Sequence, residues 1–212
     1  MEVIKSKKNR CAKIGCIASI VFASILCLFV FPRIIFTYFS LNDKIYDKKD
    51  LTDNYDRNEK DIAALISYFK SIIPEDTYVD IEINDTKKID IFHVYKEGVY
   101  YGGWDIDIDS PKADTIFSIL NWDKLQIQIL KKKLDAVNCI SIDNSYPVNI
   151  GFQRSLLSKF YYTIFDEPII ENDSLMRIYD SKCMYIFYRD NVVLQYGSGA
   201  IGSICFPKRF LE

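Results

Sequence analysis

Asp105, Asp107, His93 and Arg154 carry side chains that catalysis or ligand binding could use. Asp105 and Asp107 alternate with isoleucines, so a strand would point both carboxylates, with that of Asp109, to one side. Three such carboxylates could hold a hard cation through their oxygen atoms. However, an EF-hand loop starting at Asp105 would need glycine and glutamate where the chain has serine and isoleucine. We therefore favour the solvated face of an amphipathic strand over a weak cation site.

His93 and Arg154 each allow a chemical and a structural interpretation. His93 is the single histidine of the chain, which excludes a histidine-rich zinc site, and the cysteines lack C-x-x-C spacing. We expect a partly buried strand residue rather than a catalytic base. Arg154 follows a predicted strand and could clamp a carboxylate or phosphate with two hydrogen bonds, or bind backbone carbonyls. We favour the structural role.

A glycine-rich segment, Gly197 to Gly202, matches the G-x-G-x-x-G pattern of dinucleotide-binding proteins. That function requires a helix opening at the glycines and an acidic residue about 20 positions later. Ten residues follow Gly202, and Pro207 is among them. We expect a turn or edge-strand irregularity here and no cofactor. A hydrolase elbow is excluded, because Tyr196 occupies its first glycine position.

The N-terminal region has the pattern of a membrane anchor. Ile14 to Phe31 contains no charged residue, and as a helix it would reach about 27 Å, close to the hydrocarbon thickness of a bilayer. Five cations precede it, which predicts a cytoplasmic N-terminus. We expect a basic tail at 1–13, an anchor in the lipid bilayer at 14–39, a charged linker at 40–57 and an extracytoplasmic domain at 58–212. The five cations are Lys5, Lys7, Lys8, Arg10 and Lys13.

Two features of this segment leave alternatives open. A cleaved signal peptide or a lipoprotein is possible in principle, but the apolar run is long and no small-x-small cleavage site follows it. Gly15, Ser19 and Ala23 recur every four residues and could form a homodimer through close helix packing. Ordinary membrane-span composition explains the same stripe, and we favour it.

The charge of the chain is divided unevenly. Six of the 27 Lys and Arg residues and one of the 29 Asp and Glu residues lie in residues 1–40. The remaining 172 residues therefore hold 21 basic and 28 acidic residues, a net charge of −7. Such a domain is not attracted to phosphate groups, so nucleic acid is excluded as a partner.

Hydrophobic periodicity predicts an α+β fold. The domain should hold a mainly antiparallel sheet of about seven or eight strands with about three helices on one face. Gly102 and Gly103, inside the third strand, indicate a bulge or a close backbone approach. The predicted helices are 58–73, 110–120 and 122–137, and the predicted strands are 78–83, 89–95, 99–108, 139–142, 147–152, 159–165, 183–188 and 192–196.

Three details of this assignment can be checked individually. Asn58 is the expected N-cap of the first helix, and Leu125 is expected on the buried side of the third. The strands 159–165 and 183–188 are aromatic on both faces, so we expect both in the centre of the sheet. Among the domain cysteines, Cys139, Cys183 and Cys205, the odd number allows at most one internal disulfide, and buried thiols are the favoured interpretation.

The strings IGFQRS (150–155), KFYYTIFDEPI (159–169) and YGSGAIGSICF (196–206), behind a basic tail and one span, resemble small uncharacterised single-pass membrane proteins of Bacteroides-type bacteria. The resemblance covers most of the C-terminal half of the domain. It implies a protein of the cytoplasmic (inner) membrane whose domain faces the periplasm. It implies no activity and no functional residues.

The sequence favours a non-enzymatic, membrane-tethered module that binds a protein partner, for which an immunity or inhibitor protein is one specific form. The aromatic and acidic composition of the domain supports this hypothesis. The alternative is an envelope enzyme or small-ligand binder with a cleft lined by Asp105, Asp107, His93 and Arg154. A purely structural dimer is a third hypothesis.

Overall fold

The computed structural model describes residues 24, 26–30, 33, 46–155, 158–197, 204–207 and 210. The chain separates into two units, Met1–Lys44 and Ile45–Glu212. The described part of the first unit contains one π-helical stretch, η1 (Leu26–Val30). No helix within the described residues is long and apolar enough to cross a membrane. Most of the predicted anchor 14–39, including the stripe of Gly15, Ser19 and Ala23, lies outside the described residues.

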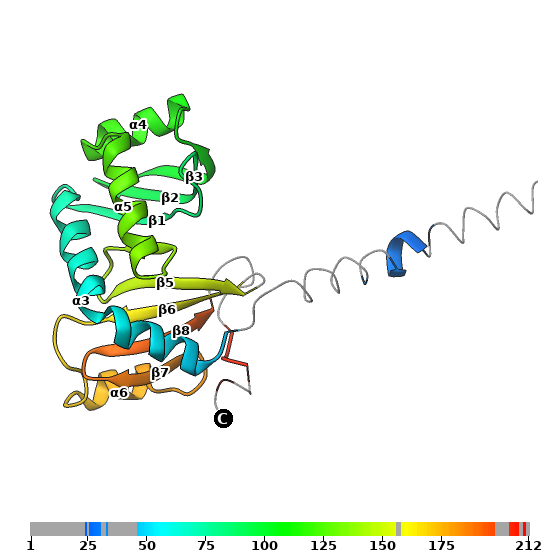
Figure 1. The fold of residues 1–212 in the computed structure, drawn as a ribbon, viewed down its shortest axis with the longest axis vertical. Helices are drawn as coiled ribbons and strands as arrows, with labels where there is room; N and C mark the ends of the chain where they lie inside the picture. Colours follow the sequence, from blue (N-terminus) through cyan, green and yellow to red (C-terminus); the bar gives the residue numbers. More distant parts are fainter. Residues whose placement is uncertain are drawn as a thin grey trace, which may run out of the picture. The chain divides into compact units, whose positions relative to one another are not determined.

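The second unit is an α+β domain, as predicted. Its eight strands form one antiparallel sheet in the order β3-β2-β1-β4-β5-β6-β8-β7 (Figure 1). The elements are α3 (Lys48–Ile72), β1 (Thr77–Glu82), β2 (Lys88–Lys96), β3 (Val99–Asp107), α4 (Pro111–Leu120), α5 (Lys124–Ala136), β4 (Ser141–Asp143), β5 (Val148–Ser155), β6 (Ser158–Ile164), α6 (Asp173–Tyr179), β7 (Tyr185–Arg189) and β8 (Val192–Gly197).

Helix α3 begins ten residues before its predicted N-cap, Asn58. Asp47 and Asp50 form a capping box at the actual start. Leu51 and Tyr55 are buried in the core, so residues 48–57, predicted as part of a charged linker, belong to the helix. The many charged residues of this stretch obscured two apolar positions that continue the stripe of the later turns.

Helix α5 buries a different residue from the one predicted in its first turn. Leu125 is 58% exposed, whereas Ile127, Leu130 and Leu134 are buried. Residues 125 and 127 lie about 200° apart around a helix, so one helix face cannot bury both. The capping box of Asp123 with Gln126 fixes the start of α5 and therefore this rotation.

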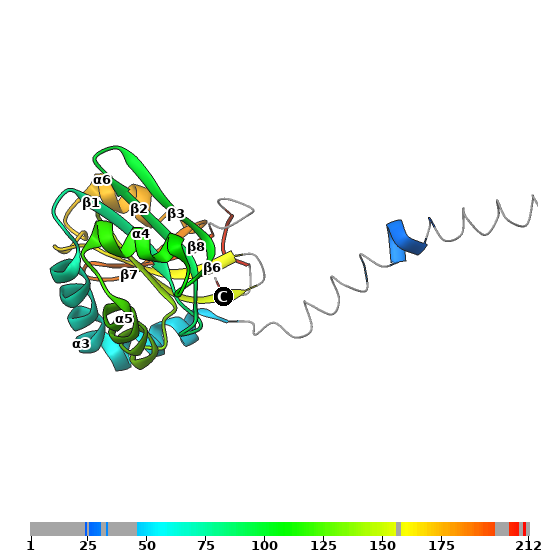
Figure 2. The same ribbon diagram turned by 90° about the horizontal axis from the view of Figure 1, so that it is seen from above.

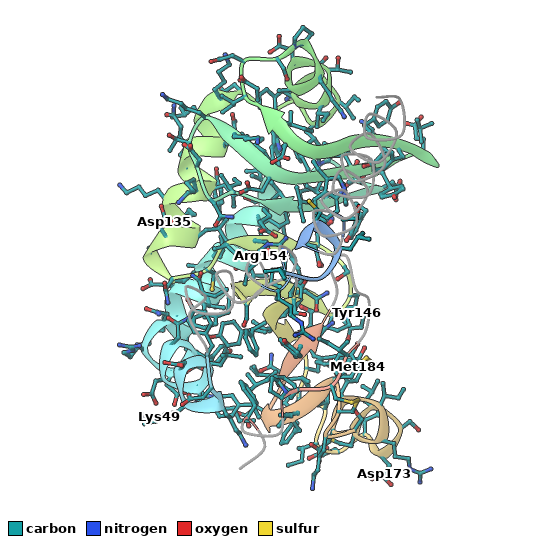
Figure 3. The ribbon with its side chains drawn as sticks, turned by 90° about the vertical axis from the view of Figure 1, so that its right-hand side faces the viewer. Lys49, Asp135, Tyr146, Arg154, Asp173 and Met184 are labelled. Atoms are coloured by element: carbon teal, nitrogen blue, oxygen red, sulfur yellow. A yellow bond between two sulfur atoms is a disulfide. The ribbon has the colours of Figure 1, made fainter. Side chains whose placement is uncertain are left out.

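The two faces of the sheet are covered unequally. Helices α3, α4 and α5 pack on one face, and their apolar residues share one core with Val79 and Ile81 of β1. Helices α3 and α5 lie side by side (Figures 1 and 2). Helix α6 packs on the opposite face near β7 and β8, against Val193. In Figure 3, Lys49 of α3 and Asp135 of α5 lie on one side of the sheet and Asp173 of α6 on the other. The predicted three helices on one face are thus α3, α4 and α5.

The strand predicted over 183–188 is an edge strand, β7, and not a central one. Its second apolar face is covered by α6 rather than by the core helices, since Tyr185 and Phe187 pack with Tyr179 and Phe165. The strand predicted over 159–165 is β6, which lies between β5 and β8 as expected.

The bonding state of the domain cysteines also differs from the prediction. Cys139 is a buried thiol, as expected, and burial raises its pKa. Cys183 and Cys205 form a disulfide instead of remaining thiols. Next to it, the Phe206 amide donates a hydrogen bond to the Cys183 carbonyl at 2.7 Å, which ties this C-terminal residue to the start of β7.

Gly102 allows the backbones of β2 and β3 to approach closely. The register between the two strands is continuous, from Lys88 opposite Asp107 to Lys96 opposite Val99, so the predicted bulge is absent and the close approach is correct. Gly102 has φ of +143°, and a Cβ there would lie 2.0 Å from the Phe92 carbonyl oxygen. Only glycine fits this position without strain.

Gly102→Ala should therefore lower the free energy of unfolding by about 2 kcal/mol or more, measured by urea denaturation. Gly98→Ala is the matched control. Gly98 also has positive φ (+78°), but a Cβ there meets nothing within 4 Å, and its substitution should cost about 1 kcal/mol. Equal costs at the two positions would show that the contact with Phe92 is unimportant.

Candidate functional site

The face of the sheet opposite α3, α4 and α5, which we call the open face, carries a cluster of aromatic side chains on β1, β2 and β3. Strand alternation and register put them together, because Tyr78 pairs with Tyr95, Tyr95 with Tyr100, and Ile91 with Trp104. We define Tyr78, His93, Tyr95, Tyr100 and Trp104 as the aromatic patch.

The rings of the aromatic patch pack against one another, and three of the five are exposed to solvent. The Tyr95 and Tyr100 ring centroids are 4.9 Å apart, and His93 lies edge-on to Tyr100 at 5.7 Å and to Trp104 at 5.9 Å. Trp104 is 60% exposed, Tyr95 47% and Tyr100 45%. Exposed clusters of large aromatic residues are typical of interaction surfaces.

A carboxylate lies next to these rings. Asp80 is directly opposite His93 in the β1–β2 pair, and its Oδ2 is 3.7 Å from His93 Nδ1. Both side chains are about one quarter exposed. Burial raises the pKa of Asp80, and the positive charge of Lys159 opposes that shift only partly. The carboxylate is therefore poorly solvated and would gain from a closer cation.

Further along the open face, a charged network joins four strands. Glu82 of β1 is fully buried and accepts two hydrogen bonds from Arg154 of β5, at 2.5 and 2.8 Å. Lys159 of β6 donates to Glu82 at 2.9 Å and to Ser141 of β4 at 2.8 Å. Burial alone would raise the pKa of Glu82, but hydrogen bonds and charges of the two cations outweigh it and lower that pKa.

Gly151 of β5 is what allows Lys159 to reach Glu82. The lysine side chain crosses β5 above this residue, where a Cβ would lie 2.1 Å from Ser141 Oγ and 3.0 Å from Lys159 Cδ. The missing side chain at residue 151 thus provides the space for the network.

The contact between Ser141 and Lys159 has the distance of a nucleophile and its base, but its setting does not suit catalysis. Lys159 is engaged in the ion pair with Glu82, and both Ser141 and Lys159 are buried. A substrate could not reach the serine hydroxyl, and activation by a base requires an available lone pair on the amine. We assign this contact a structural role.

The four residues singled out in the sequence do not meet in one place. His93 belongs to the aromatic patch and Arg154 to the charged network. Asp105 forms an ion pair with Lys88 at 2.8 Å, and Asp107 accepts a hydrogen bond from the backbone of Asp109 at 2.8 Å. Strands β3 and β5 are four strand spacings apart, about 19 Å, so these side chains cannot line one cleft.

The expectation that Asp105, Asp107 and Asp109 share one side of a strand is wrong. Asp105 has φ of +54°, β3 ends at Asp107, and Asp109 binds Lys124 of α5 instead. Across the described ranges of the chain, no group of three or more His, Cys, Asp or Glu side chains could hold a metal ion.

No catalytic or binding motif in the sequence points to Glu82, Ser141 and Lys159 as site residues. A usable signal existed for Lys159, because a lysine next to aromatic residues on both faces of a strand, in Lys159-Phe160-Tyr161-Tyr162, needs a counter-ion if both faces of that strand are buried. The identity of that counter-ion, Glu82, carries no local signal.

Comparison of the chain with protein-family models, curated proteins and solved structures found no match. The functional assignment therefore depends on the site itself, and the resemblance to Bacteroides-type membrane proteins stays a prediction.

Glu82→Gln should destabilise the domain by about 3 kcal/mol at pH 7, because it leaves the buried Lys159 and the half-buried Arg154 without their carboxylate. The contribution of Glu82 is complete above the ordinary glutamate pKa of 4.5 and is lost as the pH falls through its lower folded-state pKa. The gap between wild type and Glu82→Gln in urea unfolding should therefore shrink below pH 4.5.

The exposed Glu167→Gln variant is the control and should match wild type at every pH. A Glu82→Gln cost that is the same at pH 7 and pH 3 would contradict the assigned network.

Proposed function

We propose that the domain is a non-enzymatic protein-binding module that contacts its partner through the aromatic patch. The observation that carries this proposal is the exposure of Tyr95, Tyr100 and Trp104 together on a sheet face that the core helices leave open. Tyrosine and tryptophan are enriched at protein interfaces, because each offers a large, rigid contact area with few rotatable bonds.

The alternative function, a hydrolytic or small-ligand-binding envelope protein, has less support. It needs Asp105, Asp107, His93 and Arg154 in one concave site. Two of the four are engaged in ion pairs with Lys88 and Glu82, and the strands β3 and β5 that carry three of them are far apart in the sheet.

We further propose that residues 14–39 tether the module to the cytoplasmic membrane, with the domain in the periplasm or outside the cell. The uncharged run from Ile14 to Phe31 and the cations before it support this orientation. The Cys183–Cys205 disulfide also supports it, since disulfides persist in oxidising compartments.

The proposed orientation predicts that a C-terminal reporter enzyme that works only outside the cytoplasm is active. Activity of a reporter that works only in the cytoplasm would overturn the orientation.

The binding proposal predicts a position-specific crosslink in the native cell. A photoreactive amino acid at position 104 should give a discrete adduct with one protein, and the adduct should be lost when Tyr95 and Tyr100 are both changed to alanine. Position 125 on α5 is the matched control, because Leu125 is as exposed as Trp104 but lies on a helix that packs on the other face.

Adducts of the same mass and yield from positions 104 and 125 would contradict the proposal, and so would a complete lack of adducts at position 104.

A further inference from the structure

The aromatic patch combines two features that favour a positively charged ligand group. Tyr95, Tyr100 and Trp104 are exposed aromatic rings, and the π faces of such rings attract ammonium and guanidinium groups. Asp80 borders the patch, two residues after Tyr78 on β1 and opposite His93 on β2. A cation placed over the rings would therefore also meet a carboxylate.

The carboxylate of Asp80 is incompletely compensated. Among the residues that the structure describes, its one basic contact within 4 Å is His93 Nδ1, at 3.7 Å, which exceeds hydrogen-bond distance and is an ion pair only when the imidazole is protonated. Burial destabilises its charged form, as the raised pKa shows. A guanidinium or ammonium group at hydrogen-bond distance would offset that cost.

The remaining charges of the open face do not favour an anionic ligand. Arg154 and Lys159 are both committed to Glu82. Asp143 of β4 lies directly opposite Asp80 of β1, and with these two carboxylates the five groups hold three negative and two positive charges. Residues 41–212 as a whole carry a net charge of −7. Local and overall charge thus both attract a basic partner.

We propose that the partner binds the aromatic patch through a basic segment, whose arginine or lysine side chains lie over the rings with Asp80 as their counter-ion. This inference rests on the proposed binding function and specifies the chemistry of the partner. Arginine suits the site better than lysine, because a planar guanidinium can stack on a ring and bind a carboxylate at the same time.

The test uses the full chain in a neutral detergent and a fluorescent twelve-residue peptide of alternating arginine and glycine. Binding is measured by fluorescence anisotropy. Peptides with citrulline or glutamate in place of arginine are the ligand controls, since citrulline keeps the shape of the side chain and removes its charge. The arginine peptide should bind at least tenfold more tightly than either control.

Substitutions in and near the aromatic patch test whether the arginine peptide binds there. Asp80→Asn and Trp104→Leu should each weaken binding of the arginine peptide at least fivefold. Asp61→Asn is the matched control, because it removes the same charge from an exposed position on α3, and it should change the dissociation constant less than twofold. Thermal unfolding verifies that each variant is folded, and Tyr100→Leu replaces Trp104→Leu if the latter is not.

Equal losses for Asp80→Asn and Asp61→Asn would overturn the inference, because they would show general attraction without a site. Equal binding of the arginine and citrulline peptides would overturn it as well. A crosslink at position 104 in cells together with no peptide binding would leave the proposed function standing and refute the basic partner. Failure of both experiments would refute both.

Discussion

An eight-stranded sheet has two faces to cover, and α3, α4 and α5 cover only one of them. Period-two alternation then divides each strand between two environments. In β1, Val79 and Ile81 enter the core, while Tyr78, Asp80 and Glu82 point to the open face. Alternation thus places aromatic and charged residues on the open face, and the exposed aromatic rings among them are available to a partner.

The open face is not uniform, because ion pairs stabilise one region of it and packed aromatic rings stabilise another. Over β4, β5 and β6, the charged network buries Glu82 between Arg154 and Lys159, and Gly151 supplies the necessary space. Over β1, β2 and β3, aromatic rings pack against one another and stay exposed. The charged groups of the first region are paired with one another and contribute to stability. The rings of the second region keep solvent-exposed surface that a partner could contact. This difference is why we assign binding to the aromatic patch.

Local sequence patterns were sufficient for the fold class, the short hairpins and helix α4, whose Ser110 cap and Pro111 are explicit signals. They failed where a longer-range contact decides. The first turns of α3 are stabilised by burial of Leu51 against distant elements as well as by the local capping box, and α6 rather than the core helices covers the second face of β7. Glu82 and Lys159 are 77 residues apart and meet only because β1, β4, β5 and β6 are neighbours in that order. Strand order beyond the hairpins is not encoded in periodicity, so the sequence could not place Glu82 beside Lys159, whereas His93, Asp80 and Trp104 lie on the consecutive strands β1, β2 and β3.

The aromatic patch should be open to solvent in the free protein. Two single-tryptophan variants test it, because Trp104 is 60% exposed and Trp122 is 7% exposed in the core. With Trp122→Phe, we predict strong acrylamide quenching of Trp104 and a red-shifted emission. With Trp104→Phe, Trp122 should be quenched several-fold less. Equal protection of the two tryptophans would show that the patch is covered, and would contradict its assignment as the binding surface.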